Sequence, residues 1–95
     1  LIMATMSQNA DMKASEDFAS LIQVQLDKVI STKNRGVKQA GFHVLVGASM
    51  PNVLIEVGFL SNAKEANLLG KSQYRRNISK AIFNAIIDFK EKYAE

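Results

Sequence analysis

Residues 50–62 read MPNVLIEVGFLSN, and this stretch places one carboxylate, Glu56, within a run of apolar side chains. Pro51 and Gly58 bound the run. Aliphatic and β-branched residues between such turn formers predict a strand that is buried on both faces of an α/β sheet. The rest of the chain is therefore expected to supply further strands and the helices that cover them.

Glu56 is the residue of this strand that requires an explanation. Side chains alternate along a strand, so Glu56 shares one face with Leu54, and three branched residues occupy the other face: Val53, Ile55 and Val57. An unpaired carboxylate is costly to bury, so Glu56 should have a partner, a cavity or a catalytic task. It also lies near the carboxyl end of its strand, where open α/β sheets usually keep their sites. From this residue alone, a structural and a catalytic role are about equally supported.

Length and composition indicate one small globular domain. Ninety-five residues leave no room for a second domain, and 47% hydrophobic residues exclude a disordered chain. The net charge of +3 comes from dispersed Lys and Arg residues, so no nucleic-acid binding is predicted. Because cysteine is absent, the chain has neither disulfides nor thiolate zinc sites.

The apolar opening, residues 1–6, is interpreted as the end of a strand that begins upstream. It is too short for a membrane span and lacks the basic flank of a signal peptide, so no transmembrane segment is predicted. The chain begins with Leu1 rather than methionine, and we therefore expect a fragment or a processed product.

A long amphipathic helix is predicted from about Asp11 to Ser31. Its apolar residues recur every three or four positions: Ala14, Phe18, Leu21, Ile22, Leu26, Val29 and Ile30. The charged residues between them are expected to form a solvated outer face. The segment Asn34-Arg35-Gly36 is expected to close the helix, because Asn and Gly adopt the left-handed conformation of helix ends readily.

A second strand is predicted over Phe42 to Val46. Six residues separate it from the strand of Glu56, which is too few for a parallel crossover. If the two strands are neighbours, they should therefore be antiparallel.

Two helices are predicted after the Glu56 strand. The first covers residues 63–69, with Asn62 and Glu65 as a capping pair and Gly70 as its stop. The second is capped by Ser72 and continues to the C-terminus with an apolar stripe at helical spacing. The chain thus reads as long helix, strand, strand, short helix and long C-terminal helix.

The residues alone indicate no complete catalytic motif. His43 is the single histidine, whereas a catalytic zinc ion takes three protein ligands and a structural one takes four. The sequence has no glycine-rich phosphate loop and no Ser-His-acid arrangement that spacing supports.

Several segments together resemble the C-terminal half of the zinc-dependent N-acetylmuramoyl-L-alanine amidases. In matching order and spacing these are NRGVKQAGF at 34–42, VL at 44–45, MPNVLIEVGFLSN at 50–62, Glu65-Ala66 and Leu68-Leu69. The resemblance covers nearly all of the chain. It implies that residues 1–95 are the C-terminal portion of a single amidase catalytic domain, a partial three-layer α/β domain with flanking helices around a central twisted sheet.

The resemblance also implies a function. Enzymes of this family are bacterial cell-wall hydrolases, or autolysins, that cut the amide bond between N-acetylmuramic acid and L-alanine of peptidoglycan. A zinc ion in the complete domain activates water, and the glutamate matched by Glu56 acts as general base and then as general acid. The implied location is extracytoplasmic, either periplasmic or secreted to the cell wall, and a regulatory protein partner is compatible with it.

One departure from the family is expected to matter. The family's zinc ligands, two histidines and a glutamate, lie in its N-terminal half, and no position here matches them. We therefore expect no metal ligand in this chain, no zinc bound by it alone, and no activity without the missing N-terminal half. Three residues are weaker candidates for holding the substrate or the site loops, with a role in turns and caps favoured for each: Arg35, Gln39 and Asn62.

Two other functions remain open at this point. The chain can be a non-catalytic module that keeps the amidase scaffold and binds peptidoglycan or a regulatory partner. It can also be a structural α/β domain in which Glu56 is merely paired.

Overall fold

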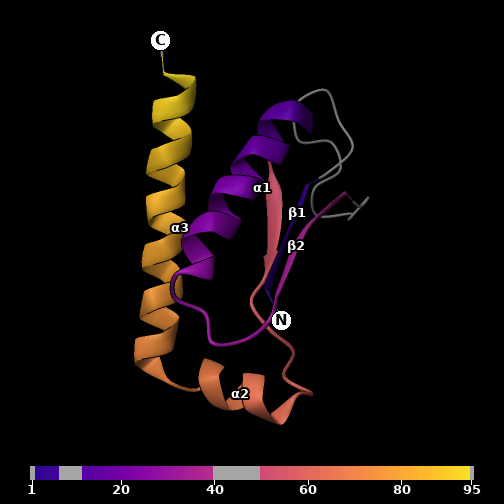
Figure 1. The fold of residues 1–95 in the computed structure, drawn as a ribbon, viewed down its shortest axis with the longest axis vertical. Helices are drawn as coiled ribbons and strands as arrows, with labels where there is room; N and C mark the ends of the chain where they lie inside the picture. Colours follow the sequence, from indigo (N-terminus) through magenta and orange to yellow (C-terminus); the bar gives the residue numbers. More distant parts are fainter. Residues whose placement is uncertain (1, 7–11, 40–49, 95) are drawn as a thin grey trace.

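The computed structural model describes residues 2–6, 12–39 and 50–94. The elements follow in the order β1 (Ile2–Met6), α1 (Met12–Asp27), β2 (Asn34–Gln39), β3 (Val53–Glu56), α2 (Ala63–Leu69) and α3 (Ser72–Tyr93) (Figure 1). Strand at the start, short helix and long final helix match the prediction. The predicted strand 42–46 and His43 lie outside the described residues.

The sheet has the order β2-β1-β3, so the first strand is its centre. Strands β1 and β2 are parallel, and the connection between them contains α1, as a parallel crossover requires. Strand β3 adds to the other side of β1 in the antiparallel direction. The described part is therefore an α/β arrangement with one antiparallel edge strand.

The register decides which residues meet at each end of the sheet. At one end Met6 lies opposite both Gln39 and Val53, and at the other Met3 lies opposite Glu56. Because β3 runs against its neighbours, the carboxyl end of β3 lies beside the amino ends of β1 and β2. The expectation that Glu56 sits where parallel strands end is thus wrong, since its strand is the antiparallel one.

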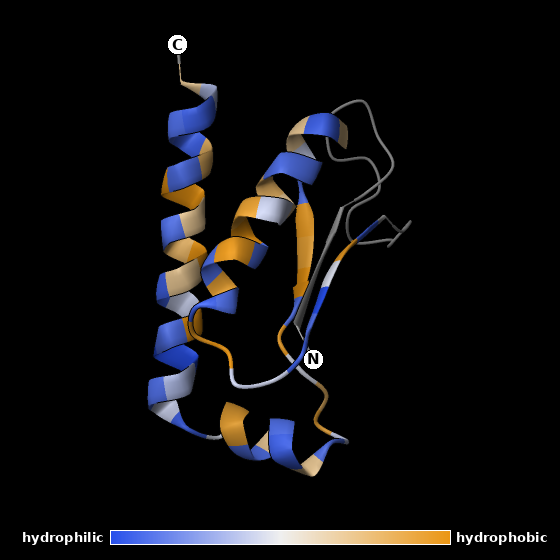
Figure 2. Cartoon of the chain, viewed as in Figure 1, coloured by the Kyte–Doolittle hydropathy of each residue, from blue (hydrophilic) through white to orange (hydrophobic). Residues whose placement is uncertain are grey.

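The core lies between the sheet and two long helices. Helix α1 contacts all three strands and α3 packs along α1, while α2 crosses below (Figure 1). Figure 2 shows β3 coloured as hydrophobic and α1 with hydrophobic and hydrophilic residues mixed along its length. The buried hydrophobic residues in the described part of the chain are Ala19, Ile22, Leu26, Tyr74, Ile78, Ala81 and Ala85. Apolar residues at three- and four-residue spacing therefore form the helix interface, as the sequence predicted.

Strand β3 is covered on one face. Val53, Ile55 and Val57 pack against the core, which confirms the predicted alternation and leaves Leu54 and Glu56 on the face away from the helices. All four residues of the strand are half-buried. The prediction of a strand buried on both faces is wrong for the described residues, because both long helices lie on the same side of it.

The segment Asn34-Arg35-Gly36 starts β2 and does not cap α1. The helix ends at Asp27, and the N–H groups of Val29 and Ile30 donate to the Leu26 carbonyl at 3.0 Å each. Gly36 does adopt a positive φ of 81°, as expected of a residue in this segment. It does so in a β-bulge, where the pairing of β2 with β1 skips a residue between Ile2 and Ala4.

The start of α3 also differs from the prediction. Lys71 is the N-cap and contributes no side-chain hydrogen bond, while Ser72 is already the first helical residue. The Ser72 hydroxyl accepts a hydrogen bond from Arg76 Nη2 at 3.2 Å. Ser72 lies one position after the N-cap, and its hydroxyl bonds the Arg76 side chain of the same helix. The N-cap residue itself therefore makes no side-chain hydrogen bond to the first turn. Within the described residues, no helix combines the length and apolar character needed to cross a bilayer.

Candidate active site

Glu56 is the last residue of β3 and lies opposite Met3 of the central strand. Its side chain is half-buried on the face of the sheet away from α1 and α3. Among the residues that the structure describes, none forms a hydrogen bond or ion pair with its carboxylate. The described residues therefore give no support to a role for Glu56 as one half of a structural pair.

The chain turns sharply after Glu56, and Gly58 makes the turn possible. Its φ of 146° is a conformation that side-chain-bearing residues rarely adopt. A Cβ atom there would also lie 3.2 Å from Leu69 Cδ1 and 3.5 Å from Glu65 Cβ. The side chains of Leu69 and Glu65 in α2 thus occupy the space that a side chain at position 58 would need.

Asn62 and Glu65 fasten this turn to α2. The Asn62 Oδ1 atom accepts from the Glu65 N–H at 3.1 Å, which confirms Asn62 as the predicted cap, whereas the return bond from the Asn62 N–H to the Glu65 carboxylate is not formed in the described part of the chain. The Glu65 carboxylate reaches beyond the cap residue and accepts from the Phe59 N–H at 3.0 Å. Asn62 N–H in turn donates to the Phe59 carbonyl at 3.1 Å. Both backbone groups of Phe59 are thus held.

Glu65 is a residue whose importance for this region the sequence reasoning missed. It is only 8% exposed, and its carboxylate holds a backbone group three residues after Glu56. The available signal was its position three residues after the cap, where an acid normally bonds the N–H of the cap residue itself. Because the Asn62 N–H already donates to the Phe59 carbonyl, the Glu65 carboxylate accepts from the Phe59 N–H instead.

The three weaker candidates occupy different places. Arg35 is exposed in the β-bulge at the amino end of β2, the end of the sheet that also holds Glu56, with β1 between them. Asn62 lies in the turn that follows β3, as the cap of α2. Gln39 pairs with Met6 at the opposite end of the sheet. The fold brings two of the three toward Glu56 and separates Gln39 from it.

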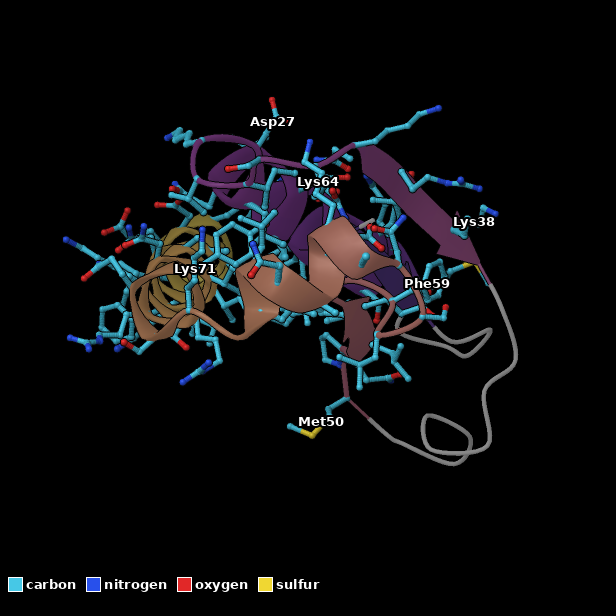
Figure 3. All side chains as sticks on the ribbon, turned by 90° about the horizontal axis from the view of Figure 1, so that it is seen from below. Asp27, Lys38, Met50, Phe59, Lys64 and Lys71 are labelled. Atoms are coloured by element: carbon cyan, nitrogen blue, oxygen red, sulfur yellow. The ribbon has the colours of Figure 1, made fainter. Side chains whose placement is uncertain are left out.

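Two large apolar side chains are exposed in the turn that follows Glu56. Phe59 and Leu60, in the turn itself, are 45% and 79% exposed. Figure 3 views the molecule from this end and shows Phe59 beside the start of α2, with Met50 well apart from it. The exposed apolar side chains thus come three and four residues after the candidate base, on a turn held by hydrogen bonds.

A zinc ion would need several ligand side chains close together in the described part of the chain. No group of three or more His, Asp or Glu side chains that could hold a metal ion occurs there. A catalytic zinc ion needs three protein ligands, so these residues do not form such a site on their own.

A charged cluster away from Glu56 ties the two long helices together. Asp17 of α1 accepts hydrogen bonds from the Tyr93 hydroxyl of α3 and from Lys13 Nζ, the latter at 2.9 Å. These two hydrogen bonds lower the pKa of Asp17 from 3.8 to about 2. The cluster joins the first turns of α1 to the last turn of α3, so its role is structural.

Comparison with known proteins places this arrangement in a family. A profile of the N-acetylmuramoyl-L-alanine amidases matches residues 2–88. The chain belongs to that family. The match includes the Glu56 strand, the Gly58 turn, helices α1 and α2 and most of α3, so the resemblance seen in the sequence is confirmed for this amidase-family chain.

Individual relatives agree with the assignment. The N-acetylmuramoyl-L-alanine amidase LytC of Bacillus subtilis is 35% identical over 75 residues, which are 79% of this chain and 15% of LytC. The CwlD amidase of Clostridioides difficile, solved in complex with the GerS lipoprotein, is 34% identical with a TM-score of 0.81, covering 96% of this chain and 47% of that one. An amidase from Clostridium difficile 630 has a TM-score of 0.91 at 22% identity, covering 99% of this chain and 50% of that one.

The amidase-family chain spans about half the length of these solved structures and a smaller share of LytC. The TM-scores confirm the predicted fold class, a partial α/β amidase domain.

Proposed function

We propose that this chain carries the general base of a peptidoglycan amidase, and that Glu56 is that base. The reaction is hydrolysis of the amide bond between the lactyl group of N-acetylmuramic acid and L-alanine. The observation that carries the proposal is the half-buried Glu56 carboxylate, without a partner among the described residues, at the end of a strand inside the family match. A structural carboxylate would be expected to have a hydrogen-bonding partner at such a position.

The chemistry requires one carboxylate in two consecutive roles. Glu56 accepts a proton from water while the water oxygen bonds to the carbonyl carbon. It then donates this proton to the alanine nitrogen as the C–N bond breaks, which leaves a lactyl carboxyl group and a free amine. Such proton transfer accelerates reactions by about 10²–10⁴-fold when the group lies within hydrogen-bond reach. Partial exposure of Glu56 lets water reach it.

Zinc is the cofactor that the family resemblance implies for the complete domain. When bound, zinc polarises the carbonyl and activates water as a Lewis acid. The described residues lack a three-ligand cluster. We therefore propose that the ligands come from residues upstream of this chain, and that the 95 residues alone bind no catalytic zinc and are inactive.

The remaining candidates are graded by their places in the fold. Arg35 is an exposed cation at the Glu56 end of the sheet, which suits it to a carboxylate of the stem peptide. Asn62 is the N-cap of α2, so we propose that it contributes to substrate binding only indirectly, by holding the turn after β3. Gln39 has the weakest support for substrate binding, because it lies at the opposite end of the sheet.

The proposed function also suggests where the protein acts and what it binds. Peptidoglycan lies outside the cytoplasmic membrane, so we propose a periplasmic or secreted protein. A regulatory protein partner is part of the proposal as well, since one similar amidase was solved in complex with a lipoprotein.

A non-catalytic module that binds peptidoglycan is the second candidate. The observation in its favour is the lack of a three-ligand cluster among the described residues. It predicts binding of muropeptides without cleavage.

The test compares Glu56→Gln with wild type in the complete protein, using purified muropeptides and chromatography of the released peptide. We expect a loss of at least about 100-fold in kcat with zinc content unchanged. Glu16→Gln, at an exposed position of α1, is the matched control and should retain full activity. Cleavage at the wild-type rate by the Glu56 variant rejects the base assignment, and wild-type protein that binds without cleaving supports the second candidate.

A further inference from the structure

The turn from Gly58 to Asn62 presents two large apolar side chains to solvent directly after the candidate base. Leu60 is 79% exposed and Phe59 is 45% exposed. Nearby leucines behave differently, since Leu68 and Leu69 pack against the hydrophobic core. A single exposed leucine is common on protein surfaces, so exposure alone gives no function.

The second observation is that this turn is fastened on both sides of Leu60, at Phe59 and at Asn62. The Phe59 N–H donates to the buried carboxylate of Glu65, and the Phe59 carbonyl accepts from the Asn62 N–H. On the other side, Gly58 is packed on Leu69 and Glu65 of α2. The turn therefore cannot fold back to cover Leu60 without breaking these contacts.

The position of the turn limits what can contact it. Leu60 follows Glu56 by four residues, so their Cα atoms are at most about 14 Å apart even in a fully extended chain. A substrate held at the Glu56 carboxylate is therefore within reach of Leu60. The amide bond to be cut is flanked by two methyl groups, that of the lactyl ether and that of L-alanine, which offer apolar surface to such a side chain.

We propose that Leu60, supported by Phe59, forms an apolar wall that binds the methyl-bearing muramoyl-L-alanine segment, and that Glu65 is the positioning residue that holds this wall beside Glu56. The inference rests on the proposed amidase function and deepens it. Leu60 contributes binding of the substrate, whereas Glu56 contributes proton transfer. Loss of the wall should therefore raise KM and leave kcat nearly unchanged.

The experiment measures kcat and KM for a muramoyl-tripeptide in the complete protein, together with Tm and zinc content. For Leu60→Ala we expect KM to rise about tenfold, kcat to stay within about twofold, and Tm to remain at the wild-type value. Leu60→Met, which keeps apolar surface, should restore most of the affinity. Phe83→Ala removes a side chain that is 60% exposed on α3, away from the turn, and should leave KM unchanged.

A second pair of variants tests the positioning role. Glu65→Ala removes the acceptor for the Phe59 N–H and should raise KM as Leu60→Ala does. Glu65→Gln keeps a carbonyl oxygen that can accept the same bond and should recover most of the wild-type KM. A merely structural role would lower Tm in Glu65→Ala and leave KM at the wild-type value, since the bond to the Phe59 N–H would then serve stability alone.

Two outcomes overturn the inference. One is an unchanged KM in Leu60→Ala. The other is a fall in Tm with loss of kcat that Leu60→Met does not repair, which would mean that Leu60 is packed against other parts of the complete protein. Failure of the base assignment is separable, because it is reported by an active Glu56→Gln variant, and the KM of the Leu60 variant can then still be measured.

Discussion

The carboxylate of Glu65 and the backbone N–H of Phe59 are joined by a 3.0 Å hydrogen bond that spans from α2 to the turn behind the Glu56 strand. Glu65 is one of the few buried polar residues in the described part of the chain. A short helix of seven residues is thereby coupled to the position of the candidate base. Under the proposed function, this contact links the local stability of the turn to the position of the general base.

Removing the Glu65 carboxylate should destabilise the fold. Glu65→Ala leaves the Phe59 N–H without its acceptor, and a hydrogen bond to a charged group contributes about 1.5–3 kcal/mol. We expect a loss of this size in the free energy of unfolding, measured by urea denaturation followed by circular dichroism. Glu65→Gln should lose clearly less. Equal losses in the two variants would show that charge, rather than the hydrogen bond, determines the effect.

Gly58 should tolerate no side chain. Gly58→Ala forces a Cβ into a backbone at φ 146° and to within 3.2 Å of Leu69, so we expect a loss of about 1–3 kcal/mol in the free energy of unfolding. Gly70→Ala is the matched control, because Gly70 has an ordinary φ of −70°. Its change should stay within about 0.5 kcal/mol. Comparable losses at both glycines would contradict the backbone explanation.

The Asp17 cluster should respond to the loss of Tyr93 and to acid. In Tyr93→Phe the pKa of Asp17 should rise from about 2 toward 3.8, because the largest cause of the lowering, the Tyr93 hydrogen bond, is gone. The folded-state pKa is lowered, so the stabilisation is fully present above pH 3.8 and is lost as pH falls through about 2. NMR titration of the Asp17 carboxyl carbon measures the shift. An identical titration in wild type and Tyr93→Phe would argue against the bond.

Metal binding should distinguish this chain from the complete protein. We expect no stoichiometric zinc binding by the 95 residues in isothermal calorimetry, because the described part supplies no three-ligand cluster. In the complete protein, chelation should abolish cleavage and added zinc should restore it. Tight one-to-one binding by the short chain would overturn the proposal that the ligands lie upstream.

Elements whose signals are local were predictable from the sequence. Helix α2 was predicted with its observed bounds, because Asn62, Glu65 and Gly70 specify its cap and its end through neighbouring atoms. The alternation of β3 was predictable for the same reason, since the face that Val53 and Ile55 share follows from strand geometry.

Features that depend on distant pairing were not predictable. The positive φ of Gly36 suits a helix end and a strand bulge equally, and only pairing with β1 decides between them. The hydrophobicity of β3 does not indicate which of its faces other elements cover. The sequence therefore predicted burial on both faces, whereas the strand is half-buried. The separation of Gln39 from Glu56 likewise follows from the opposite directions of β2 and β3.

The central place of β1 has a consequence for the order of folding. Strand β1 and its parallel neighbour β2 are joined through α1 and can pair early, as a comparatively local unit. Strand β3 pairs with β1 across about fifty residues of chain, as Met3 does with Glu56. Contacts between residues so distant in sequence form late, because a long loop must close first. The strand that bears the candidate base should therefore be the last to join the sheet, so that the proposed catalytic end is assembled only after most of the chain has been synthesised.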